Sequence, residues 1–314
     1  MTMSTLRRAG QVVCPAVIVL LLIATTVPAT TPSVGRASSR PWGGELQLLS
    51  VQPSTTVDGR GTRERVGEQL DQISEQAHVA VSVRDEASGD WFDYGTGRFA
   101  TASLVKVHLV ALMSWRAQQT GVPLTAAQRA DAEQMLVRSE NDPTLQAYFA
   151  LGGPLGIEAG FKEAYGTSGV RIGDRGLWGH STTSPRAVVK LLEQVLDPAN
   201  RSTYALLQDA MSRVIPTQRF GISVLADPGT TVQTKVGWVQ DPEGWIVNSS
   251  GRVILDGSPV LISVMSDRNP TLEAGIATVE EVARLAGDVV KDARAEAELD
   301  WHELGTRISK NDGT

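Results

Sequence analysis

Cysteine is almost absent from this chain of 314 residues, which contains one, Cys14. A single cysteine excludes a disulfide framework and a cluster of thiolate metal ligands. Positive charge is also scarce, because 29 Lys and Arg stand against 35 Asp and Glu and leave a formal net charge of −6. This acidic balance argues against a nucleic-acid partner, and 41% hydrophobic residues are too many for a disordered chain. The composition indicates a globular protein of one or two domains with a buried core.

The apolar run near the N-terminus is too short for an ordinary membrane span. It covers residues 12–27, whereas a spanning helix needs roughly 20 residues. Arg7 and Arg8 precede the run and the small residue Ala29 ends it, an order typical of a secretory signal. We therefore expect residues 1–29 to be a signal peptide and the protein to be secreted. The alternative is an uncleaved segment that holds the protein at the cell envelope.

The rest of the chain divides into a linker, a large domain over 62–291 and a tail. Residues 30–61 are rich in Ser, Thr, Pro and Gly and lack a period, which predicts a flexible linker. Residues 292–314 are polar; a frayed surface helix is the default reading, and a partner-binding tail is the alternative. Within the domain, the period of the apolar residues predicts these elements: a helix over 62–77, strands over 79–83 and 91–94, helices over 103–119, 125–138, 142–153, 154–165, 184–196 and 202–214, strands over 231–238, 244–249, 251–255 and 259–266, and a helix over 276–290.

The order of these elements predicts the fold class. Strands lie at both ends of the domain, and a helical block over about 103–214 separates them. We expect an α/β (α+β) domain in which the N- and C-terminal strands join in one antiparallel sheet, with the helical block beside it. Two helix starts are marked in the sequence. Thr125 with Gln128 forms a capping box, and Asp142 forms an N-cap before Pro143.

A serine and a lysine stand three residues apart at the start of the predicted helix over 103–119. Residues at this spacing share one face of a helix, so Lys106 can reach the hydroxyl of Ser103. Serine becomes a nucleophile when a base removes its proton, and lysine can be that base where burial or a neighbouring cation lowers its pKa. The spacing alone is common by chance, so its meaning depends on the motifs that follow it.

Two further motifs accompany this pair. Ser139-Glu140-Asn141 falls where one predicted helix ends and the next begins, and Lys235-Val236-Gly237 lies on a predicted strand whose glycine lets a substrate backbone approach closely. In this order and context, the three motifs resemble the serine β-lactamase and penicillin-binding protein superfamily, and class A β-lactamases most of all. The segment around Ser103 is also similar to secreted actinobacterial serine hydrolases.

The resemblance implies how the catalytic residues divide the reaction. Ser103 would be the acylated nucleophile, Lys106 its base and Ser139 the proton relay between the two lysines. Class A enzymes also carry a loop glutamate that activates the deacylating water, and the loop over 166–182 has no glutamate. Asp174 is the only carboxylate of this loop, so it is either a substitute for the glutamate or a solvated loop acid. We expect acylation, and the rate of deacylation stays open.

The resemblance also implies a substrate site. Asn141 would hold the side-chain amide of the substrate, and Lys235 would attract its carboxylate. Gly237 would give the substrate room, and the backbone N–H groups of Ser103 and Trp238 would form an oxyanion hole, where one donor contributes about 3–4 kcal/mol. Val236 replaces a Thr or Ser hydroxyl of the superfamily, which removes a hydrogen bond to the carboxylate of about 1–2 kcal/mol.

No cofactor and no metal are expected. Residues 95–100, Gly-Thr-Gly-Arg-Phe-Ala, match a loose form of the dinucleotide-binding fingerprint. No second parallel strand with a ribose-binding acid follows them, so we interpret them as a turn. His302 lacks a second histidine at metal spacing, and His180 beside Ser181 lacks the Gly-x-Ser-x-Gly elbow of other serine hydrolases.

These observations predict a secreted, monomeric serine acyl-enzyme that attacks a β-lactam or a related amide. Its partner would be a small-molecule or peptidoglycan-like substrate rather than a nucleic acid, with membrane contact only through an uncleaved signal. Two alternatives stay open. One is an acyl hydrolase of the D-alanyl carboxypeptidase or esterase type, and the other is a non-hydrolysing protein, either a penicillin-binding sensor or a catalytically silent fold.

Overall fold

The computed structural model describes residues 59–166 and 169–311. The predicted signal peptide (1–29) and nearly all of the predicted linker (30–61) lie outside the described residues. Among the helices that are described, none is both long and apolar enough to cross a membrane.

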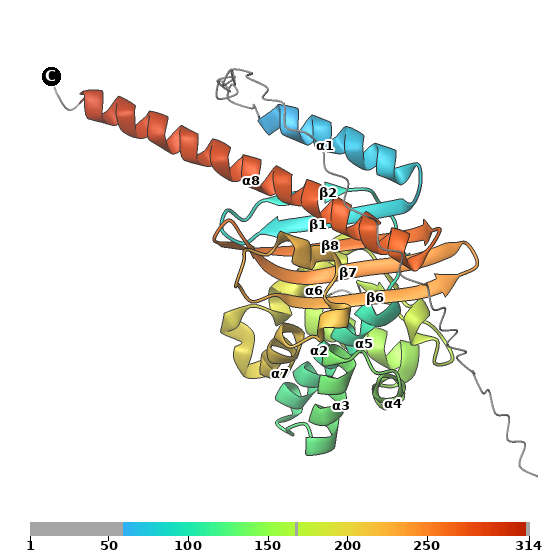
Figure 1. Ribbon diagram of the computed structural model, residues 1–314. Helices are drawn as coiled ribbons and strands as arrows, with labels where there is room; N and C mark the ends of the chain where they lie inside the picture. Colours follow the sequence, from blue (N-terminus) through green and yellow to red (C-terminus); the bar gives the residue numbers. More distant parts are fainter. Residues whose placement is uncertain (1–58, 167–168, 312–314) are drawn as a thin grey trace, which may run out of the picture. The chain divides into compact units, whose positions relative to one another are not determined.

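A five-stranded antiparallel sheet joins the two ends of the domain, as the sequence predicts (Figure 1). Its strand order is β2-β1-β8-β7-β6, so β1 pairs directly with β8 and β6 forms an edge. The strands are β1 (His78–Asp85), β2 (Trp91–Tyr94), β6 (Gln233–Asp241), β7 (Gly244–Leu255) and β8 (Ser258–Asn269). A second, three-stranded sheet has the order β3-β5-β4 and consists of β3 (Phe99–Ala100), β4 (Val170–Arg171) and β5 (Thr182–Thr183).

Helices α1 (Gly59–Ser74) and α8 (Leu272–Asn311) cover one face of the large sheet (Figure 1). Val79, Val81 and Val83 of β1 belong to one buried cluster with apolar side chains of these two helices. Alternate residues of a strand point to opposite faces, and Ala80 accordingly joins a second cluster on the other face. Because both faces are covered, β1 is buried along most of its length.

The helical block packs on that other face and is centred on α2, whose first eight residues are all buried. Thr125 and Gln128 form the predicted capping box of α3, and Ser184 Oγ accepts a hydrogen bond from Ala187 N at the start of α6. The α-helices are α2 (Val105–Thr120), α3 (Ala126–Val137), α4 (Asp142–Ala150), α5 (Gly153–Tyr165), α6 (Pro185–Val195) and α7 (Arg201–Ser212). Short 3-10 helices connect them: η1 (Ala102–Leu104), η2 (Trp178–His180), η3 (Pro198–Asn200), η4 (Pro216–Gln218) and η5 (Gly221–Leu225).

Three predicted boundaries are wrong. The strands expected over 244–249 and 251–255 are one continuous strand, β7. The last helix does not end at 290 but continues through Asn311, so most of the predicted tail prolongs α8. The N-cap of α4 is Asn141 rather than Asp142, which is the first residue of the helix.

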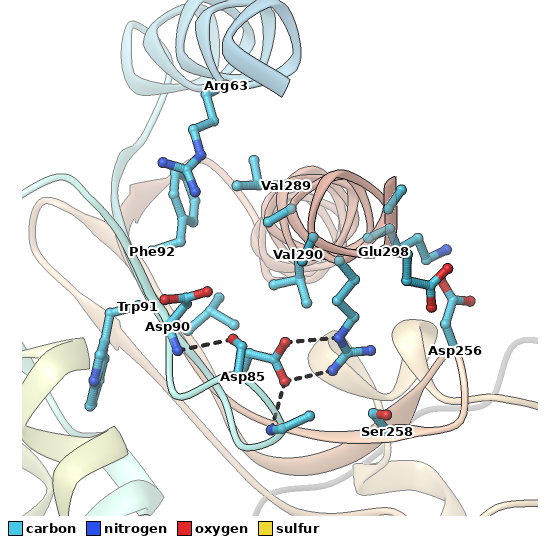
Figure 2. Close-up of a pocket in the computed structure, with 18 residues that line it drawn as sticks. Arg63, Asp85, Asp90, Trp91, Phe92, Asp256, Ser258, Val289, Val290 and Glu298 are labelled. Atoms are coloured by element: carbon cyan, nitrogen blue, oxygen red, sulfur yellow. Dashed lines mark hydrogen bonds and ion pairs between the residues drawn. The ribbon is translucent and has the colours of Figure 1, made fainter. Parts of the chain in front are cut away.

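An ion pair ties α8 to β1 beside a cavity of about 580 Å³. Figure 2 shows Asp85 facing this cavity. Asp85 is 4% exposed, and its carboxylate accepts two hydrogen bonds of 2.8 Å from the guanidinium of Arg294. Burial alone would raise the pKa of Asp85, but Arg294 and the amide of Ala87 outweigh it and hold the pKa below its ordinary value.

Candidate active site

Ser103 and Lys106 meet at the junction of η1 and α2. Ser103 lies in η1 and Lys106 in the first turn of α2. Lys106 Nζ donates a hydrogen bond to Ser103 Oγ over 3.0 Å. Residues three apart face the same side of a helical turn, so the local backbone alone brings the hydroxyl and the amine together.

Two non-glycine residues in this region have a positive φ. Ala102, directly before Ser103, has φ 44°, and Ser139 has φ 63°. Such a conformation costs on the order of 1–3 kcal/mol and persists where the surrounding structure enforces it, often at functional sites. Ala102 directly precedes Ser103 and Ser139 contacts Lys106, so two of the strained residues of the described chain flank this pair.

The connection between α3 and α4 supplies the next group of contacts. Lys106 Nζ donates to Ser139 O at 2.5 Å and to Ser139 Oγ at 3.1 Å. It also donates to Asn141 Oδ1 at 2.9 Å. Asn141 caps α4 through its backbone, and its side chain makes no cap hydrogen bond. Two residues of the second predicted motif, Ser139 and Asn141, thus accept hydrogen bonds from Lys106 of the first motif.

Lys235 of β6 also contacts Ser139. Its Nζ donates to Ser139 Oγ at 2.9 Å and to Val236 O at 3.0 Å. Ser139 Oγ therefore accepts hydrogen bonds from both amines. A hydroxyl in this position is able to carry protons between two lysines that lie 129 positions apart in the sequence.

Both lysines are fully buried, with 0% exposure. Burial lowers the pKa of Lys106 to about 7, and the nearby charge of Glu140 opposes this shift. Burial, followed by the charge of Lys106, holds the pKa of Lys235 well below its ordinary value. An amine with a pKa near 7 is half neutral at physiological pH, and it can then take a proton from a hydroxyl.

Gly237 lets the edge strand β6 pass close to the nucleophile. A Cβ at this position would lie 2.7 Å from both Ser103 N and Thr101 O, a separation that side chains do not adopt in proteins. Asn248 of β7 reinforces the contact, since its Nδ2 donates to Ala100 O at 2.9 Å and to Thr101 O at 3.2 Å. The sheet thus fixes the segment that carries Ser103.

Of the other predicted residues, Val236 and Trp238 lie on β6 beside this contact and Asp174 lies apart from it. Val236 is fully buried, and Trp238 packs against Phe220 with ring centroids 5.7 Å apart. The side chain of Asp174 is 77% exposed and lies 3.5 Å from Arg175 Nε. The structure brings Ser103, Lys106, Ser139, Asn141, Lys235, Val236, Gly237 and Trp238 to one place.

No protein-family model matches the sequence, and no curated protein matches it. Solved structures do match. The class A β-lactamase from Bacteroides cellulosilyticus DSM 14838 is 16% identical with a TM-score of 0.62, and the match covers 73% of this chain and 98% of that one. The class A β-lactamase from Mycobacterium abscessus is 20% identical with a TM-score of 0.60, covering 70% and 97%. The chromosome-encoded β-lactamase of Vibrio parahaemolyticus is 18% identical with a TM-score of 0.61, covering 72% and 99%.

This chain has the class A β-lactamase-like fold. Identities this low carry the fold and not the activity, so the chemistry of this β-lactamase-like chain is argued from its own residues. Those residues include one that sequence reasoning missed. Trp178 of η2 places its ring 4.9 Å from Lys106 Nζ. The signal in the sequence is a single large aromatic residue in the glycine-rich loop that follows the second motif.

Within the described residues, no group of three or more His, Cys, Asp and Glu is arranged to hold a metal ion. The charged groups of the β-lactamase-like site are the two buried lysines and, at the surface, Glu140. The arrangement supplies a hydroxyl and two buried amines whose pKa values are lowered, one of which contacts the hydroxyl.

Proposed function

We propose that this protein is a secreted serine acyl-enzyme of the β-lactamase-like kind, which attacks a β-lactam or a related amide through Ser103. One observation carries the proposal. The amine of Lys106 lies 3.0 Å from Ser103 Oγ and has a pKa of about 7, so a poor nucleophile stands beside a base that is active at neutral pH.

Acylation then follows from the contacts. The neutral amine of Lys106 takes the proton of Ser103, and the Ser103 oxygen adds to the carbonyl carbon of the amide. The C–N bond breaks, and the leaving nitrogen receives a proton through Ser139 Oγ, which bonds both amines. The backbone N–H groups of Ser103 and Trp238 stabilise the charge that develops on the carbonyl oxygen.

Lys235, which contacts Ser139 Oγ from the side away from Lys106, contributes to recognition of the substrate. A protonated Lys235 attracts a carboxylate, and Asn141 offers an amide for hydrogen bonding beside Lys106. Because Val236 contributes no hydroxyl, the carboxylate depends on the charge of Lys235. This chemistry suits a penicillin, a cephalosporin or a peptidoglycan-like peptide that ends in a carboxylate.

A second candidate is a penicillin-binding sensor that forms a stable adduct. The exposure of Asp174 favours it, because no carboxylate is hydrogen-bonded to Ser103 or Lys106 in the described part of the chain. Hydrolysis of the acyl-enzyme would then be slow. Turnover of a chromogenic cephalosporin supports the hydrolase, and a lasting adduct supports the sensor.

Labelling with a fluorescent penicillin tests the nucleophile. Wild-type protein should gain the mass of one penicillin, and Ser103→Ala should gain none, because the ester oxygen is absent. Ser88→Ala is a matched control in an exposed turn, where Ser88 Oγ accepts a hydrogen bond from Asp90 N, and it should label like the wild type. Equal labelling of Ser103→Ala and wild type would refute the assignment.

Export belongs to the same proposal and rests on the order of residues 1–29. Expression in a bacterium with a secretory pathway, followed by N-terminal sequencing of the protein outside the cytoplasm, tests it. A mature chain that begins at Thr30 is expected, and retention of the whole chain in the cytoplasm contradicts export.

A further inference from the structure

The loop that carries Trp178 is held firmly in place. Ser181 O accepts a hydrogen bond of 2.7 Å from Thr101 N, directly beside the strained turn before Ser103. Ser181 Oγ donates to Trp178 O at 2.6 Å and accepts from Gly173 N at 3.0 Å. Trp178 itself is half-buried and packs against the core of the helical block. The backbone of this loop is therefore hydrogen-bonded to the segment that leads into Ser103, and the ring of Trp178 packs beside it.

Four oxygens and one aromatic ring surround the amine of Lys106. Its Nζ donates to four oxygens, which belong to Ser103, Ser139 (two atoms) and Asn141 and lie 2.5–3.1 Å away. These oxygens engage the hydrogens of the amine, but a water that gives up its proton bonds to the lone pair of the neutral amine, which they do not occupy. The ring of Trp178 lies over the same amine at 4.9 Å and offers an aromatic face in place of a hydrogen-bonding group.

Hydrolysis of an acyl-enzyme needs an activated water. The water oxygen must add to the acyl carbon while a base takes its proton, and the bond from that carbon to Ser103 Oγ then breaks as the oxygen regains a proton. Lys106 is the base nearest to Ser103, and Asp174 is exposed and turned to Arg175. A water that cannot bond to Lys106 is therefore not activated.

We propose that Trp178 sets the lifetime of the acyl-enzyme by keeping water away from the amine of Lys106. The inference rests on the proposed function, because it concerns the ester formed at Ser103. Trp178 is a positioning residue: it touches Lys106 and acts on the reaction through that amine. The species whose lifetime Trp178 sets is the ester between Ser103 and a β-lactam or related acyl group, which is hydrolysed slowly.

The test follows the formation and the loss of a fluorescent penicillin label separately. Trp178→Ala should lose its label at least about 10-fold faster than wild type, since access to a general base contributes 10²–10⁴-fold. The rate of labelling should stay within about 3-fold, because Ser103 and Lys106 keep their contact. Trp178→Phe retains an aromatic face over the amine and should keep the slow loss of label.

Trp91→Ala is the matched control. Trp91 also stacks on a cation, with the guanidinium of Arg186 3.4 Å from its ring centroid, but it lies on β2, at the opposite edge of the sheet from β6. This variant should lose its label at the wild-type rate. Trp178→His serves where the alanine variant fails to fold, because it keeps a flat ring and adds a hydrogen-bonding nitrogen; it too should shed the label faster.

The pH profile distinguishes water exclusion from general loosening. In Trp178→Ala the loss of label should rise with pH through about 7, where Lys106 becomes neutral. A loss of label that is equal in Trp178→Ala, Trp178→His and wild type overturns this inference and leaves the proposed function standing. Absence of label from every one of these proteins, wild type included, overturns the proposed function and this inference together.

Discussion

Ser139 Oγ accepts hydrogen bonds from two buried amines, 3.1 Å from Lys106 Nζ and 2.9 Å from Lys235 Nζ. Burial of two like charges so close together is unfavourable for the folded state, because each loses its hydration and repels the other. The arrangement is accordingly explained by chemistry rather than by stability. It leaves Lys106 about half neutral at physiological pH, whereas an exposed lysine with a pKa near 10.4 is protonated.

The pH dependence of acylation follows from the pKa of Lys106. In the proposed reaction the neutral amine is the base, so the rate of labelling by a fluorescent penicillin should rise with pH and level off above the pKa of about 7. Below that pKa it should fall about tenfold per pH unit. Glu140 raises this pKa, so Glu140→Gln should move the midpoint to lower pH. A labelling rate that is flat from about pH 5.5 to 8 contradicts Lys106 as the base.

The sequence predicted which residues gather at the site better than it predicted their surroundings. The spacing of Ser103 and Lys106 is local, so helix geometry sufficed, and the placement of Ser139 and Lys235 followed from a resemblance. Trp178 could not be placed, because its position depends on how an irregular loop packs on η1. The role given to Asp174 stays a prediction, and its exposure favours the solvated alternative.

At the scale of elements, the capping box of α3 was predictable, whereas the N-cap of α4 was placed one residue too late and the continuity of β7 was missed. The capping box of α3 depends on two residues three apart. The false break in β7 came from the run Ser249-Ser250-Gly251, which resembles a turn in sequence. In the fold, Ser249 Oγ donates to Phe220 O at 3.1 Å and Ser250 Oγ bonds Ser263 Oγ at 2.8 Å. Partners distant in the sequence satisfy these hydroxyls, and the strand continues.

The pair Asp85–Arg294 should stabilise the attachment of α8 to β1. Arg294→Met removes two charge-assisted hydrogen bonds from a carboxylate that is 4% exposed, and the free energy of unfolding should fall by about 3 kcal/mol. Urea unfolding measures the change. Arg284→Met on the same helix is the control, because its pairs with Glu280 and Glu281 are partly exposed and should contribute less than about 0.5 kcal/mol. Equal losses in the two variants would contradict a special role for Arg294.

For the whole molecule, the buried lysines predict stability that increases with pH. Between the folded pKa of Lys106, about 7, and the unfolded pKa near 10.4, the unfolded chain binds one more proton at this site than the folded chain does. The free energy of unfolding therefore rises with pH there, by up to about 1.4 kcal/mol per pH unit for each such group. Lys106→Met should show a slope that is smaller by about this amount in urea titrations from about pH 7.5 to 9. Parallel slopes for the two proteins would contradict a depressed pKa.

The pairing of β1 with β8 also dictates when the candidate site can assemble during synthesis. His78 is matched to Asp267 across this ladder, and the strand that carries Lys235 joins the sheet only through β7 and β8. β1 can pair early with β2, but a ribosome must release almost the whole domain before β8 can pair with β1, and such non-local topologies form slowly. A growing chain that already contains Ser103 and Lys106 therefore has no fixed position for Lys235 until its last hairpin has formed.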